Sequence, residues 1–403
     1  MTNTVASSPP AVAPRPPLVT RPLLLRFVSL LGGSTSFYLL LSAVPDFAAA
    51  HGGGGGTAGL ATGALMLSTV AGELVTPALV GRLGYRVVLA AGLALLGAPA
   101  PALAASGALW LVVSVCVLRG VGFAFTVVAG GALTASLVPA ERRGEGLALV
   151  GIVSGVPALV ALPLGVWLAA HAGYGVVFTT GAAAALAAIV SVPGLPDRIK
   201  ESGRRVSMSQ GLRSGELLRP ALVFAATTLA AGIVVTFLPL IVPRAQSGTV
   251  TAGLLVQPAA ATAARWVAGR RGDRRGPAGL VIPGLLLAVL GTLLMALAGT
   301  ASDGPVGVVV AMAVFGAGFG FAQNSTLTLM YTRVPAAGFG TVSGLWNFAY
   351  DAGMGVGALA FGQIASATGY PWAFALTALA MLTALVPALI DRRFVTRPKE
   401  ALQ

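Results

Sequence analysis

Long apolar segments separated by short polar connections recur along nearly the whole chain. Each segment approaches the roughly 20 residues that a helix needs to cross a hydrocarbon core about 30 Å thick. The apolar residues run continuously and do not alternate with a period of two, which favours helices over the strands of a membrane barrel. We therefore predict an all-α membrane protein with twelve transmembrane helices, at 23–45, 57–80, 87–106, 108–137, 146–170, 175–194, 220–242, 250–268, 279–300, 306–331, 341–365 and 371–390.

The composition agrees with a chain that lies mostly in a lipid bilayer. Of its 403 residues 56% are hydrophobic and 9% charged, against roughly 25% charged residues in a soluble protein. The net charge of +13 does not predict nucleic-acid binding, because the basic residues lie in the connections and form no stripe with interleaved aromatic residues. A single cysteine, Cys116, and two distant histidines give no basis for a disulfide, a metal site or a cofactor.

The polar connections predict the domain organisation. Residues 195–219 form the only long polar connection, and we expect them to be a cytoplasmic linker between the six-helix bundles 21–194 and 220–392. Residues 1–20 are rich in proline and predict a disordered cytoplasmic tail, and residues 393–403 predict a second tail. The first apolar segment also resembles a signal peptide, but the repeat described below requires it as a helix.

The basic residues predict the orientation in the membrane. Nearly all of them fall on connections that share one side with both tails, whereas Arg244 alone lies on the other side. Because cytoplasmic connections carry the excess of Lys and Arg, both termini are predicted to be cytoplasmic and the number of crossings to be even. The bias toward Ala, Gly, Arg and Pro indicates a bacterial chain, and hence the bacterial cytoplasmic (inner) membrane.

The two halves of the chain repeat one another at an offset of about 196 residues. Leu118–Phe125 aligns with Val314–Phe321, and Gly173-Tyr174 aligns with Gly369-Tyr370. One offset that holds across three helices and their connections predicts two pseudo-repeated six-helix bundles. Membrane proteins built from parallel repeats hold their substrate between the repeats.

A second repeated pattern carries a family resemblance. The segment Gly269–Gly276, with Asp273 and Arg274, matches the pattern Gly-x-x-x-Asp-Arg-x-Gly, and the first half keeps Arg82 and Gly84 but has Gly81 at the aspartate position. In these patterns and in its two-half plan the chain resembles the major facilitator superfamily over about residues 21–392. The resemblance implies a gating role for Arg82, Asp273 and Arg274.

The resemblance to bacterial drug and metabolite efflux permeases also implies a function. It predicts a secondary transporter and not an enzyme, one that acts as a monomer and exports a small, moderately hydrophobic organic molecule in exchange for protons by alternating access. A proton-coupled importer or facilitator of a polar nutrient is the alternative. A receptor or scaffold that transports nothing would leave the buried charges without an obvious role.

Four ionisable residues fall within predicted spans, namely Glu73, Arg119, Arg265 and Asp351. Each costs about 2.5–3.5 kcal/mol at mid-membrane on insertion scales and therefore needs a partner or a function. Arg119 lies near mid-bilayer, and it is predicted either to bind, couple or gate, or to form a structural ion pair. Glu73 and Arg265 occupy related positions of the two halves and predict either a gate pair or two separate structural pairs, and the resemblance implies no direct contact between them.

Asp351 is the predicted proton carrier or ligand-binding carboxylate. Ser343, Asn347 and Asp351 recur at a spacing of four residues and share one helix face, which should line a cavity. A satisfied hydrogen-bond site between helices is the alternative. The remaining predicted cavity residues are polar or amphipathic and lie at mid-depth: Gln257, Gln323, Asn324, Trp346 and Tyr350.

Overall fold

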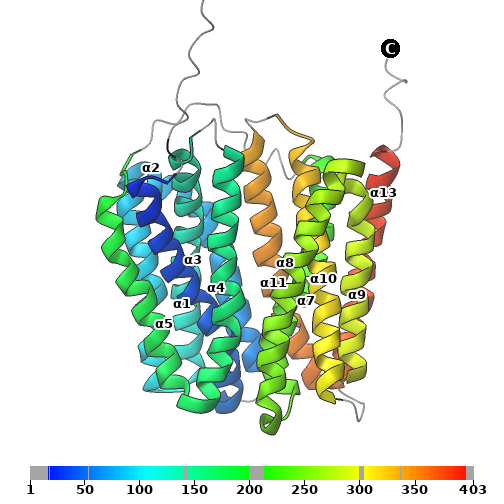
Figure 1. Cartoon of the computed structure of the whole chain (residues 1–403). Coiled ribbons are helices and arrows are strands. Elements are labelled where there is room, and N and C mark those ends of the chain that lie inside the picture. Colours follow the sequence, from blue (N-terminus) through cyan, green and yellow to red (C-terminus); the bar gives the residue numbers. More distant parts are fainter. Residues whose placement is uncertain are drawn as a thin grey trace, which may run out of the picture.

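Long, nearly parallel helices form two bundles that stand side by side (Figure 1). This computed structural model describes residues 17, 19–52, 54–139, 143–198, 213–298, 304–335 and 338–395. Most of the predicted terminal tails and the middle of the predicted linker lie outside these residues. The side of the molecule where α1 begins and α13 ends is called the terminal side below, and the opposite side the far side.

The first bundle contains five α-helices. They are α1 (Arg21–Gly52), α2 (Gly55–Gly97), α3 (Leu109–Leu137), α4 (Arg143–Ala172) and α5 (Tyr174–Ala188), with 3₁₀ segments at Ala100–Ala104 and Ile189–Gly194. The second bundle contains α7 (Gly215–Ile241), α8 (Ser247–Arg275), α9 (Val281–Ala298), α10 (Gly304–Tyr331), α11 (Phe339–Thr368), α12 (Tyr370–Leu382) and α13 (Leu385–Val395), with 3₁₀ segments at Arg244–Gln246 and Pro277–Leu280.

These helices account for twelve membrane crossings in the described part of the chain. Nine helical segments are long and apolar enough to cross a membrane, and one of them, Gly55–Ala104, contains two of the predicted spans. Its two parts meet at a kink at Gly84, where φ is 84° and ψ is 168°. The more polar helices α8 and α11 complete the set. The predicted all-α fold of twelve helices in two pseudo-repeated bundles is confirmed.

Backbone conformation repeats between the halves as the sequence does. Positive φ angles occur at Gly84 and Gly276, which open the third and ninth spans, and at Gly173 and Gly369, which open the sixth and twelfth. A side chain would be strained in this conformation, whereas glycine adopts it freely. The same sharp turn is therefore built at equivalent places in both halves.

Three predicted spans differ from single regular helices. The third and sixth end in 3₁₀ turns, and the twelfth is broken between α12 and α13. Pro101, Pro193 and Pro387 lie at these places. Proline lacks an N–H and its ring clashes with the carbonyl four residues earlier, so it weakens a regular α-helix at its own position. The three predicted spans are therefore present, each with a local irregularity.

The two halves meet along α1, α2 and α4 of the first and α7, α8 and α11 of the second. In the contacts between halves α2 packs on α11 and α7, α1 on α7, and α4 on α8. Toward the far side, α2 and α11 approach so closely that a Cβ on Gly362 would lie 2.7 Å from the carbonyl oxygen of Gly55. The hydroxyls of Thr62 and Thr236 join α2 to α7 at 2.8 Å. The far side is therefore tightly closed between the halves.

Candidate functional site

Asp351 and Glu73 face each other across the boundary between the two halves. Asp351 lies on α11 and is 5% exposed, and Glu73 lies on α2, the helix that packs along α11. Their side-chain carboxyl groups interact at hydrogen-bonding range. The boundary thus contains a carboxyl group from each half.

No arginine or lysine of the described residues forms an ion pair with these two carboxyl groups, although Asp391 pairs with Arg219 and Arg333 elsewhere on the terminal side. Oε1 of Glu73 is buried and has no hydrogen-bond partner there. An ionised carboxylate only accepts hydrogen bonds, so two carboxyl groups can bond to each other only if one carries a proton.

Arg265 of α8 lies close to the same boundary without binding the carboxyl pair. Its guanidinium donates to Oγ1 of Thr262 at 2.8 Å and interacts electrostatically with Tyr38 of α1 and Tyr350 of α11. Both tyrosines in turn interact with Asp351. Glu73, Arg265, Asp351 and the two tyrosines therefore form one cluster between the halves, called the central cluster below.

An aromatic wall borders the central cluster in the second half. Trp346 and Tyr350 lie one turn apart on α11, with ring centroids 6.2 Å apart. Phe224 of α7 stacks on Trp346 at 4.3 Å, and Phe319 of α10 lies 6.3 Å from Tyr350. Trp346 and Tyr350 are partly exposed beside the polar groups, whereas Phe224 and Phe319 are buried behind them.

Four predicted cavity residues carry amide groups on α8, α10 and α11, namely Gln257, Gln323, Asn324 and Asn347. Gln257 is buried and the others are partly exposed. None of the four amide side chains forms a hydrogen bond with another described residue. Ser343, by contrast, bonds to the hydroxyl of Tyr331 at 2.6 Å. The amides are therefore free to bond to water or to a ligand.

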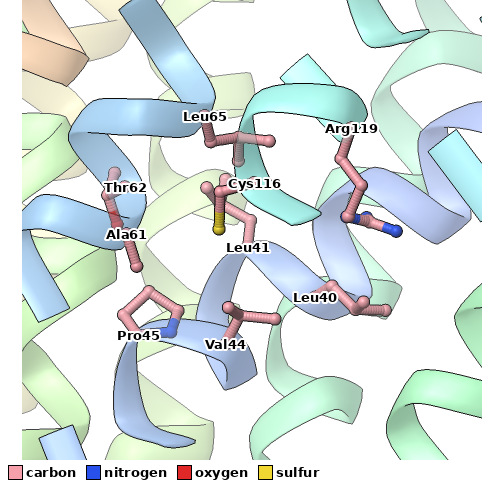
Figure 2. Close-up of a pocket in the computed structure, with 9 residues that line it drawn as sticks. All are labelled: Leu40, Leu41, Val44, Pro45, Ala61, Thr62, Leu65, Cys116 and Arg119. Carbon is pink, nitrogen blue, oxygen red and sulfur yellow. The ribbon is translucent and has the colours of Figure 1, made fainter. Parts of the chain in front are cut away.

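Arg119 lies apart from the central cluster, inside the first half. It is 2% exposed, and its guanidinium donates to the carbonyl oxygens of Leu96 and, at 3.0 Å, Ser36. These bonds join α3 to α2 and α1. Figure 2 shows Arg119 at one edge of a pocket whose other walls are almost entirely apolar. The pocket has a volume of about 10 Å³, which is room for no more than one water molecule.

The residues of the loop pattern lie at the terminal side. Arg82 and Arg274 are exposed, and neither forms an ion pair with another described residue. The side chain of Asp273 lies outside the described part. In the first half Asp197 serves the turn after Gly84, because its backbone oxygen accepts from Tyr85 N at 3.0 Å and its carboxylate from Arg86 N at 3.2 Å.

Several residues of the site carried no signal in the sequence. Tyr38, Phe224 and Phe319 lie in apolar segments where an aromatic residue is unremarkable. Arg26 lies near the start of the first span, yet it is buried and donates to the Gly130 carbonyl at 3.0 Å and to Thr134 at 3.1 Å. Only the packing of the helices reveals these roles.

Twelve membrane-crossing helices in two packed halves, with charged and polar groups buried between them, define a polytopic membrane transporter. The chain belongs to the Major Facilitator Superfamily, whose family model matches residues 26–358. It is therefore a transporter of small molecules and not an enzyme.

Relatives and solved structures agree with this assignment. The chain is 32% identical over 387 residues to a protein of Streptomyces lividans called "Chloramphenicol resistance protein", covering 90% of this chain and 95% of the relative. A variant of the nucleoside transporter NupG superimposes with a TM-score of 0.73 at 15% identity over 93% of this chain and 99% of its own. A D-xylose–proton symporter has a TM-score of 0.73 at 14% identity over 91% and 96%. The two structures share the fold with this chain.

Proposed function

We propose that this transporter exports a small, moderately hydrophobic organic molecule across the bacterial cytoplasmic membrane in exchange for protons. The observation that carries the proposal is the buried carboxyl group of Asp351, which lies between the halves and beside the aromatic wall. The wall would bind an apolar, planar part of the molecule, and Asp351 would carry the proton. The relative called a chloramphenicol resistance protein supports export, because resistance follows when a toxic compound leaves the cell.

The remaining site residues would act around this centre. Gln257, Gln323, Asn324 and Asn347 would hydrogen-bond to polar groups of the substrate, and the loop residues Arg82, Asp273 and Arg274 would act in gating. Rocking of the two halves would expose the site to each side of the membrane in turn. We expect a single chain to complete this cycle.

Accumulation of toxic compounds tests the direction and the coupling. Cells that express the chain should accumulate less of a transported compound than cells that lack it, and Asp351→Asn should abolish efflux driven by the proton gradient while substrate binding stays measurable. Glu216→Gln, which changes an exposed carboxyl group at the start of α7, serves as the matched control. Unchanged proton dependence in Asp351→Asn would remove Asp351 from the coupling role.

The four free amide groups favour one alternative, a proton-coupled importer of a polar nutrient. Such groups suit a ligand with many hydroxyl or amide groups. The same experiment separates the two functions, because an importer would raise accumulation of its substrate in expressing cells.

A further inference from the structure

We propose that Glu73 and Asp351 form one proton-binding site shared by the two halves, and that this proton holds α2 against α11 while the far side is closed. The proposal rests on the proton-coupled function proposed above and gives Glu73 the partner Asp351, in place of the Arg265 that the sequence suggested. It follows from where the pair lies, from its chemistry and from its neighbours.

The pair continues the zone where the halves are in closest contact. From the far side inward, α2 meets α11 where Gly55 lies beside Gly362 and where Met66 lies beside Gly355, whose Cβ would be 2.9 Å from that of Met66. The Glu73–Asp351 contact follows toward the terminal side. A bond at this place therefore spans the moving boundary directly.

The chemistry of the pair requires a proton in this conformation. Asp351 is buried, and Oε1 of Glu73 lacks any hydrogen-bond partner among the described residues. With one proton, a carboxyl O–H of one residue donates to the carboxylate of the other, and the pair carries a single negative charge. When that O–H bond breaks and the proton passes to water, two adjacent carboxylates remain, and they repel each other.

The neighbours of the pair do not remove this requirement. Tyr38 of α1 and Tyr350 of α11 interact with Asp351, and Arg265 of α8 interacts with the tyrosines. From α7, Thr228 contributes a neutral hydroxyl that donates to the Ala349 carbonyl at 3.1 Å. Arg119 of α3 is engaged by backbone carbonyls. A hydrogen bond through one shared proton can therefore join the two carboxyl groups.

This arrangement suits exchange of a proton for a substrate. Proton loss toward the terminal side would weaken the α2–α11 contact and favour opening of the far side, where the substrate would leave. A new proton entering from the far side would restore the bond and the closed state. Proton binding and closure would thus be one event.

Distance measurements between the far-side ends of the halves test this inference without a substrate. Cys116 is the only cysteine, so a Cys116→Ala background with Ala105→Cys and Ser366→Cys, both at exposed positions, accepts a spin label on each half. In lipid nanodiscs we expect short distances at low pH and a growing population of long distances as the pH rises. Glu73→Gln and Asp351→Asn each place an amide donor where the proton lies, so either variant should keep the short distance at every pH.

The control and the contrary outcomes are equally specific. Glu216→Gln should respond to pH as the unsubstituted protein does. Distances independent of pH in the unsubstituted protein, or a normal response in Glu73→Gln, would overturn the shared-proton site. If both amide variants fail to fold, infrared spectra of the unsubstituted protein decide. The band of one protonated carboxyl group should vanish as the pH rises, with the same midpoint as the change in distance. A spectrum without this band would overturn the proposal. If the distance depends on pH but the protein exports nothing, the proposed function alone would be refuted.

Discussion

Two arginines in the first half show how a full charge is kept inside a membrane bundle. Arg119 and Arg26 are both buried, and both donate to backbone carbonyls of neighbouring helices. A carbonyl oxygen has two lone pairs, so one that already serves a helix can accept a further bond from a guanidinium. Arginine thereby joins helices without an acidic partner, a possibility that the predicted structural ion pair of Arg119 did not include.

The two predicted roles of Arg119 can be separated by substitution. Arg119→Met removes the donor to two buried carbonyls and should cost about 1–3 kcal/mol of stability, measured as a lower Tm of the purified protein, with transport kept in the folded fraction. Val117→Ala, at an exposed position of the same helix, is the control. An unchanged Tm together with lost transport would instead place Arg119 in substrate binding or coupling.

At the scale of helices, small residues determine how the halves meet. Gly59 of α2 lies against the Ala358 carbonyl of α11, whereas a Cβ on Gly56, less than one turn away, would meet its nearest atom, Nε2 of Gln363, at 3.8 Å. Glycine and other small residues let membrane helices approach closely, and this contact replaces the hydrophobic drive that lipid cannot supply. The α2–α11 contact is thus sensitive to single methyl groups at some positions and not at others.

The same substitution at these two glycines gives a matched test. Gly59→Ala should push α2 from α11 and lower the closed population at the far side, with a cost of about 1–3 kcal/mol as for other overpacked contacts. Gly56→Ala should leave the distance between labels at Ala105→Cys and Ser366→Cys unchanged. Equal effects of the two substitutions would show that close approach at Gly59 does not control closure.

At the scale of the whole molecule, the charges of the described residues are distributed unequally between the two sides. The terminal side carries Arg82, Arg86, Arg270, Arg271 and Arg333 among others, while the connections at the far side contain Arg244 alone. Positively charged connections remain in the cytoplasm during insertion. This asymmetry predicts that the terminal side faces the cytoplasm.

Reporter fusions test that orientation. A fluorescent protein fused after Gln403 should fold and fluoresce, whereas alkaline phosphatase at the same place should stay inactive, because the phosphatase matures only outside the cytoplasm. A phosphatase inserted at Ala105 should be active. The reverse pattern would contradict cytoplasmic termini.

The amino-acid sequence alone determined the class of fold. Whether a segment enters the membrane depends on its own hydrophobicity and length, and backbone hydrogen bonds in lipid must be satisfied within each helix. The repeat, visible at Gly173 and Gly369, then divided the helices into two halves. These properties are local or periodic, so they can be predicted without knowing which helices touch.

Only the tertiary structure showed which residue each buried charged group contacts. Asp351 was predicted as a site residue from its spacing, but its contact with Glu73 was not predicted, and neither were the bonds of Arg119 to the carbonyls of Ser36 and Leu96. Such contacts depend on the rotation and depth of helices that are distant in the chain, and packing of side chains from several helices sets both. Charge and hydropathy show that a buried group needs a partner, and only the folded arrangement selects which one it finds.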